Sequence, residues 1–180
     1  TAGGQYRLAA VPAMKQELAK TISTYLTFCK KYGAEVIYGV KATKEMLEQE
    51  GFDEIILACG AQPLVPRIPG IDGENVYLAN QVLSFDVRLS GQKILVLGAG
   101  LVGAEAAEVL STYGNKVTVV DMLDKAAPLA PLRPRENLLS RLDKAGVGFY
   151  LNSRVCEIRP DGIRYEQNGE TKEMTGFDSI

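Results

Sequence analysis

The sequence predicts an α/β fold in which a strand–helix–strand unit is followed by a short antiparallel β-meander. Three observations support this fold class. A continuous apolar segment, KILVL (93–97), runs directly into the glycine-rich stretch GAGLVG (98–103). A small-residue helix and a second apolar segment, KVTVVD (116–121), come next. Several strand-sized segments separated by turn residues then complete the chain, and apolar runs of this length are typical of buried parallel strands.

The composition is that of an ordinary globular protein. The 180 residues are 46% apolar and 23% charged, enough for one domain or two small ones. Twenty Lys and Arg against 22 Asp and Glu give a net charge of -2, so no basic surface indicates a nucleic-acid partner. The longest apolar runs are strand-sized and predict no membrane span. Nothing at the N-terminus resembles a secretory signal.

The side chains offer little catalytic chemistry. The absence of histidine excludes Ser-His-Asp hydrolases and HExxH metalloproteases for this chain, and no Tyr has a Lys four residues later. Cys29, Cys59 and Cys156 are far apart and lack CxxC spacing, which favours free thiols in a reducing, cytoplasmic compartment over a disulfide or metal site. We therefore predict no catalytic residue and no metal ligand here; a cofactor would carry the chemistry.

The first half of the chain predicts two helices and two strands. Apolar residues spaced three and four apart predict a helix over 14–32, and Thr43 is the expected N-cap of a helix over 43–50. AEVIYGV (34–40) is typical of a short strand, and DEIILACGA (53–61) of a buried parallel strand that enters a tight loop.

A change in amino-acid composition then predicts a domain boundary near residues 90–92. Residues 62–92 are rich in Pro and Gly and contain only a weak short helix. We therefore divide the chain into residues 1–91 and residues 92–180.

The second half continues the α/β pattern. A helix is expected over 104–113, stopped by Gly114-Asn115, and another over 135–146. The remaining strands, expected to form an antiparallel meander with turns at Asp161-Gly162 and Asn168-Gly169, are residues 147–152, 154–159, 162–167 and 170–175.

The glycine-rich stretch lies where a dinucleotide-binding turn requires it. Gly98 permits the sharp turn from strand to helix, Gly100 lets a pyrophosphate approach the backbone, and Gly103 lets the helix pack closely on the strand. Ala99, Leu101 and Val102 complete a loop whose N–H groups face the phosphates at a helix N-terminus. The alternative is a glycine-rich turn that binds nothing. The register of strand, glycines, helix and strand favours a Rossmann-like NAD site.

Two acids refine this prediction. Asp121 ends the second strand 23 residues after Gly98, where an acid binds the adenosine ribose. Neither Met122 nor the two residues after it is an Arg that could receive a 2′-phosphate, so NADH is expected over NADPH. Glu105, expected in the first helical turn, either stabilises the helix dipole or lies near the nicotinamide end of the cofactor.

Three stretches together resemble one family. GGQYRLAAVP, DEIILACGAQPLVPRIPGIDG and KILVLGAGLVGAEAAEVLSTYGNKVTVVDML are similar, in this order, to the C-terminal region of bacterial NADH:flavin oxidoreductases, the enoate and 2,4-dienoyl-CoA reductase relatives. In that family an old-yellow-enzyme barrel is fused to a two-dinucleotide module. The middle and last stretches also resemble pyridine-nucleotide disulfide reductases more generally.

The resemblance implies which residues meet each cofactor. Gly3, Gly4 and Gln5 would lie close to FAD, as would Ala58, Cys59 and Gly60, although Cys59 stands where Thr is usual. Glu105 matches the acid of the GxGxxGxE variant, which favours its functional role. Residues 1–91 would then be an incomplete FAD-domain segment, and residues 92–180 a C-terminally truncated NAD domain.

The implied function belongs to a larger flavoenzyme. Hydride would pass from NADH to FAD and on through FMN and a 4Fe–4S centre to an enoate, enoyl-CoA, quinone or similar acceptor. The opening TAGGQYRLAAVP is expected to be the far side of a flavin site whose first half, with the barrel, lies in the rest of the polypeptide. The isolated chain is expected to bind NADH weakly and FAD poorly. The alternatives are a disulfide- or ferredoxin-reductase type of flavoprotein and a non-catalytic NAD-sensing module.

Overall fold

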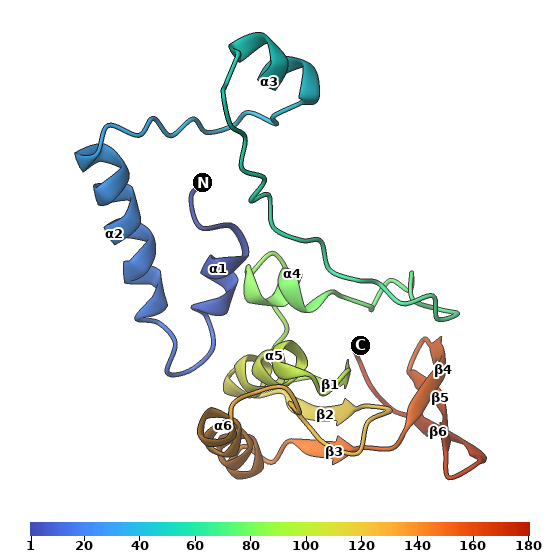
Figure 1. Ribbon diagram of the computed structural model, residues 1–180. Coiled ribbons are helices and arrows are strands. Elements are labelled where there is room, and N and C mark those ends of the chain that lie inside the picture. Colours follow the sequence, from blue (N-terminus) through green and yellow to red (C-terminus); the bar gives the residue numbers. More distant parts are fainter. The chain divides into compact units, whose positions relative to one another are not determined.

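The computed structural model describes residues 1–180, and the chain divides into two compact units, residues 1–62 and 63–180 (Figure 1). The second unit contains both sheets and nearly all of the core. The predicted assignment of residues 1–91 and 92–180 to two different dinucleotide domains stays a prediction.

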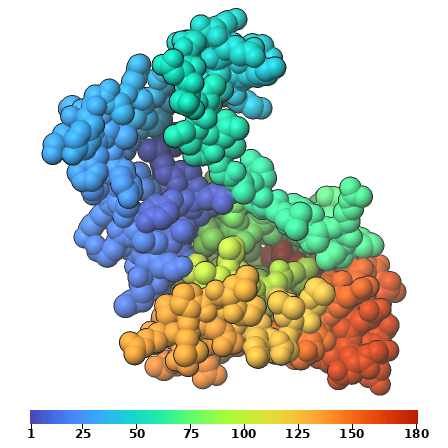
Figure 2. Space-filling view, viewed as in Figure 1, coloured from blue at the N-terminus to red at the C-terminus, as the bar shows by residue number.

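The first unit is helical. It contains α1 (Gly4–Ala9), α2 (Leu18–Lys31) and α3 (Lys44–Glu50). Helix α2 confirms the helix predicted over 14–32 and begins four residues later than expected, after Met14, whose φ is 66°. Helix α3 is confirmed together with its cap, since the Thr43 hydroxyl accepts the Met46 N–H at 3.3 Å. Figure 2 shows this unit in space-filling form, in the blue to teal part of the colour scale.

The two strands predicted in this unit are wrong. Neither residues 34–40 nor residues 53–61 form a strand. A strand is held by hydrogen bonds to a neighbouring strand, and the first unit contains no sheet to supply one. As a result Ile56 and Leu57, expected to be buried, are 91% and 81% exposed.

The second unit contains a parallel sheet with helices on one face. Strands β1 (Lys93–Leu97), β2 (Lys116–Val120) and β3 (Gly148–Tyr150) lie in that order, with Ile94 opposite Val117 and Thr118 opposite Gly148. The last residues extend this sheet, because Ser179 bridges Ile94 in parallel at the free edge of β1.

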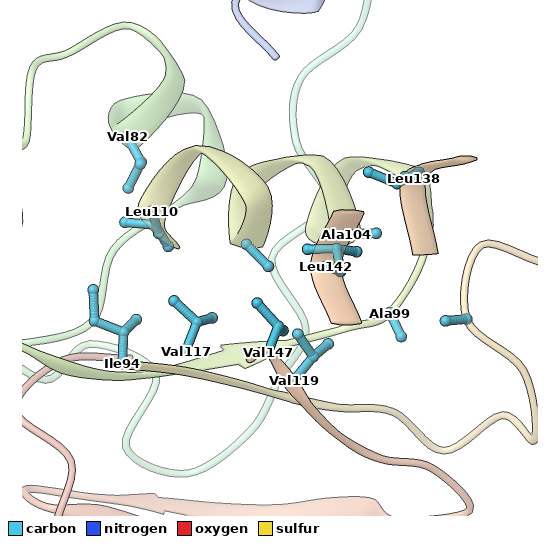
Figure 3. Close-up of a cluster of buried hydrophobic side chains, with 12 residues drawn as sticks. Val82, Ile94, Ala99, Ala104, Leu110, Val117, Val119, Leu138, Leu142 and Val147 are labelled. Carbon is cyan, nitrogen blue, oxygen red and sulfur yellow. The ribbon is translucent and has the colours of Figure 1, made fainter. Parts of the chain in front are cut away.

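Helices α5 (Leu101–Thr112), α6 (Leu132–Lys144) and α4 (Ala79–Leu83) supply the cover for this face of the sheet. Ile94, Val117 and Val119 point from the strands toward α5, where Ala104 and Leu110 belong to the same buried cluster (Figure 3). Helix α6 begins three residues before its predicted start, and it tolerates Pro134 because the first turn needs no intrahelical N–H.

An antiparallel sheet covers the other face. Strands β4 (Arg154–Arg159), β5 (Gly162–Gln167) and β6 (Glu170–Thr175) confirm the predicted meander, with Asn168 and Gly169 at φ 54° and 78° in its second turn. Ile158, Ile163 and Tyr165 pack against Leu95 and Val120 of the parallel sheet. The segment 147–152 was also predicted to belong to the meander. This was wrong, because its strand β3 pairs with β2 in parallel.

Candidate functional site

The loop between β1 and α5 has the geometry that its glycines predict. Gly98 has a φ of 107°, in the left-handed region, and its N–H donates to the Val120 carbonyl at 2.8 Å. A Cβ on Gly103 would overlap the Gly98 carbonyl oxygen, so only glycine allows the helix to approach the strand this closely. The turn therefore brings the start of α5 directly over the end of β1.

Gly100 lies at the N-cap of α5 and faces open space. Its φ of -63° suits any residue, and a Cβ added there would meet no atom within 4 Å. No side chain caps the helix, and its first turn carries no acid. The first N–H groups of a helix have no intrahelical partner, and with the helix dipole they attract an anion. Leu101 and Val102, which carry two of these N–H groups, are 40% and 55% exposed.

Asp121 follows β2 directly and lies beside this turn. Its carboxylate accepts the Ala99 N–H at 2.5 Å and the Leu123 N–H at 2.8 Å. Met122, which separates the two residues, is 64% exposed. The structure thus brings Gly98–Gly103, Asp121 and Met122 together at the carboxyl edge of the parallel sheet. The N–H of Ala99, which was expected to face a phosphate, is buried and donates to Asp121 instead.

Glu105 occupies a different position from the one expected. Because α5 begins at Leu101, three residues earlier than predicted, Glu105 lies in the second turn and only 7% of it is exposed. On the same helix Glu108 accepts a hydrogen bond from Arg141 of α6. That bond raises the pKa of Arg141, and the charges of Glu108 and Glu105 raise it further. The carboxylate of Glu105 therefore acts on the Arg141 guanidinium of α6. Because Glu105 lies beyond the first turn, stabilisation of the helix dipole no longer explains its position.

One hydrogen bond connects the two predicted flavin-site segments within the first unit. The Gln5 side-chain amide donates to the carbonyl of Ala61, the residue that follows Gly60, 56 positions later in the sequence. Gly4 and Gly60 have φ values of 43° and 74°. Cys59 is an exposed free thiol, whereas the buried strand predicted over 53–61 would have enclosed it.

The loop after β2 is a partner of the glycine turn that was not predicted from the sequence. Ala127 is fully buried, and its N–H donates to the Ala99 carbonyl at 2.6 Å. The Arg135 guanidinium donates to the Ala126 carbonyl at 2.7 Å and so ties the loop to α6. In the sequence, the two small residues Ala126 and Ala127 within a Pro-rich stretch are the only indication that this loop packs closely against the glycine turn.

Metal-binding clusters and membrane-spanning helices are both absent from the structure. The structure contains no cluster of three or more Cys, Asp or Glu side chains that could hold a metal ion. None of its helices combines the length and apolar character needed to cross a bilayer.

Comparison with known proteins assigns the fold. The family model described as pyridine nucleotide-disulphide oxidoreductase matches residues 3–180. The chain belongs to this family. The resemblance drawn from the three sequence stretches is therefore confirmed, and so is the fold class, a Rossmann-like dinucleotide-binding domain with a parallel and an antiparallel three-stranded sheet.

Several oxidoreductases are similar to this family member over most of its length. The bilirubin reductase of Mediterraneibacter gnavus is 33% identical over 172 residues, which are 96% of this chain and 26% of the relative. The cinnamate reductase of Clostridium sporogenes is 36% identical over 93% of the chain and 25% of its own length. The NADH oxidase of Thermoanaerobacter brockii is 34% identical over 89% of the chain and 25% of its length. The chain thus spans about a quarter of these relatives.

Solved structures share the fold. A 2-naphthoyl-CoA reductase in complex with 2-naphthoyl-CoA superposes with a TM-score of 0.90 at 24% identity, over 99% of this chain and 27% of that one. The histamine dehydrogenase of Rhizobium sp. 4-9 gives a TM-score of 0.80 at 20% identity, over 100% of this chain and 30% of that one. At these identities the likeness is one of fold.

Proposed function

We propose that this family member binds NAD(H) at the glycine turn, as part of a flavin-dependent NAD(P)H oxidoreductase. The geometry at Gly100 supports this proposal most directly. Gly100 stands at an uncapped helix N-terminus, with open space where a Cβ would be. A pyrophosphate can approach the backbone there and accept the first N–H groups of α5, including those of Leu101 and Val102. Gly98 and Gly103 shape the turn that makes this approach possible.

Asp121 and Met122 would receive the adenosine half of the cofactor. The Asp121 carboxylate lies beside the turn and can accept the ribose hydroxyl groups, whereas a 2′-phosphate in the same place would be repelled. NADH is therefore the expected cofactor. Glu105, buried in the second turn of α5, contributes negative charge further along the helix.

The first unit would contribute part of an FAD site. Gln5, which follows Gly4, donates a hydrogen bond to Ala61, the residue that follows Ala58, Cys59 and Gly60, and this bond connects the two segments. The exposed apolar segment 53–61 is consistent with a strand whose neighbours lie in the rest of the polypeptide. That polypeptide would then be the partner of this chain, and the free cysteines favour a cytoplasmic location.

When bound, NADH and FAD would supply hydride chemistry, and FMN with a 4Fe–4S centre would be held by the rest of the polypeptide. The residues of this chain position and orient NADH and part of FAD. Relatives named bilirubin reductase and cinnamate reductase support an acceptor with a reducible carbon–carbon double bond. An enoate or an enoyl-CoA meets that description, and a quinone, which is reduced at its oxygens, is the alternative acceptor.

A matched pair of glycine substitutions tests the NAD site. Gly100→Ala places a methyl group where the pyrophosphate would approach, at a φ that alanine adopts without strain. Gly148→Ala is the control, because its Cβ would lie 3.9 Å from the Thr118 hydroxyl, an ordinary contact away from the turn. Titration of the chain with NADH, followed by nicotinamide fluorescence, should give a dissociation constant that rises about tenfold or more in Gly100→Ala alone. Equal constants in both variants would contradict the proposal.

A further inference from the structure

The Asp121 carboxylate is the junction between the glycine turn and the loop that follows β2. One oxygen, Oδ2, accepts the Ala99 N–H at 2.5 Å, and the other, Oδ1, accepts the Leu123 N–H at 2.8 Å. The loop closes the connection from its other end, because the Ala127 N–H donates to the Ala99 carbonyl at 2.6 Å. Both backbone groups of Ala99 are thus held by residues of the loop.

These bonds fix the part of the turn that a pyrophosphate would meet. Ala99 is fully buried, so water cannot replace a lost partner for its N–H. Ala99 also lies between Gly98, whose φ of 107° is restricted to glycine, and Gly100, the N-cap of α5. The orientation of the peptide groups on either side of Ala99 therefore depends on Asp121.

We propose that Asp121 is a positioning residue for the cofactor pyrophosphate, in addition to its ribose contact, so that removing its charge does not convert the site to NADPH. This inference rests on the proposed NAD site. A carboxylate offers about four acceptor directions, and the two backbone N–H groups use two of them. The other two remain for ribose hydroxyl groups, so one side chain performs both tasks.

Asparagine cannot perform the positioning task. Its amide has an acceptor on one atom only, and the other atom is a donor. In either orientation of the amide, the N–H of Ala99 or of Leu123 faces a donor. Neutralising Asp121 therefore removes the repulsion of a 2′-phosphate and, in the same step, loosens the turn that binds the phosphates of both cofactors.

The test compares Asp121→Asn with Asp124→Asn, a control that removes one charge from an exposed residue of the same loop. NADH and NADPH dissociation constants are measured for the wild-type chain and both variants. In Asp121→Asn both constants should rise, about tenfold each, while Asp124→Asn leaves both near the wild-type values. An unchanged or tighter NADPH constant in Asp121→Asn overturns the inference. A wild-type chain that binds neither nucleotide refutes the NAD site itself.

A measurement on the wild-type chain keeps the inference testable even when Asp121→Asn does not fold. Leu123 is 48% exposed, in a loop, and its N–H has Asp121 as its hydrogen-bond acceptor. Amide hydrogen exchange followed by NMR should show Leu123 protected relative to Met122, the exposed residue before it. Equal exchange at the two positions shows that the carboxylate does not hold the loop, and overturns the inference.

Discussion

The effects of substituting Gly103 and Gly100 can be distinguished by experiment, because the two glycines have different roles in the structure. A Cβ on Gly103 would overlap the carbonyl oxygen of Gly98 and lie 3.0 Å from its carbonyl carbon. Both atoms belong to the backbone, so no side-chain rotation relieves the overlap. Gly103→Ala therefore forces α5 away from the end of β1.

The cost follows from what α5 covers. Ala104 and Ala107 of this helix are fully buried against the sheet, and separating helix and strand opens that packing. Overpacking against rigid neighbours costs about 3 kcal/mol, and the better helix propensity of alanine returns up to about 1 kcal/mol. The expected net loss in the free energy of unfolding is about 2 kcal/mol, a fall of about 4–8 °C in Tm.

Urea unfolding followed by far-UV circular dichroism measures this loss. Gly148→Ala again serves as the control, since it adds the same methyl group at an unstrained position. The midpoint should fall for Gly103→Ala and stay near the wild-type value for both Gly148→Ala and Gly100→Ala. A Gly103→Ala midpoint equal to that of the control would refute the close approach of helix and strand.

Three further changes have defined outcomes. Arg141→Met removes the partner of the buried Glu108 carboxylate and should cost about 1–2 kcal/mol in chemical unfolding. Because the pair raises the pKa of Arg141, its contribution is lost only as pH rises through that value, so the cost should be constant from about pH 6 to 9. Asn115→Ala leaves the Gln92 N–H and the Leu89 carbonyl without their partner and removes one of two hydrogen bonds to the Leu110 carbonyl, so it should lower the free energy of unfolding by about 2 kcal/mol, measured by thermal denaturation. Thr43→Ala should raise the pKa of Glu45, measured by NMR titration, but not to its ordinary value. The first cause of its lowered pKa is its own backbone N–H, and the Thr43 hydroxyl is the second. Since that pKa is lowered, the stabilisation of α3 by this carboxylate is present at neutral pH and lost as pH falls through the folded value.

The sequence predicted the second unit more accurately than the first. Strand β1 has the predicted bounds, and β4, β5 and β6 occupy the predicted segments with the predicted antiparallel pairing. In these segments the hydrophobic pattern and the turn residues agree with packing that the chain itself provides. Residues 53–61 show an equally clear apolar pattern, yet they form no strand, because a strand requires a neighbour and the first unit supplies none.

Local chemistry therefore determined the glycine turn, the Thr43 cap and the hairpin at Asn168-Gly169, since each depends on a few adjacent residues and the φ values open to them. Contacts between distant residues were decided only by the tertiary structure. Examples are the parallel pairing of β3, the burial of Glu105 and the hydrogen bonds of Ala99 with Asp121 and Ala127. A sequence pattern specifies which face of an element is apolar. Which backbone groups meet across the fold depends on how the elements pack, and in this chain that packing placed an acid predicted for a ribose against the turn predicted for a phosphate.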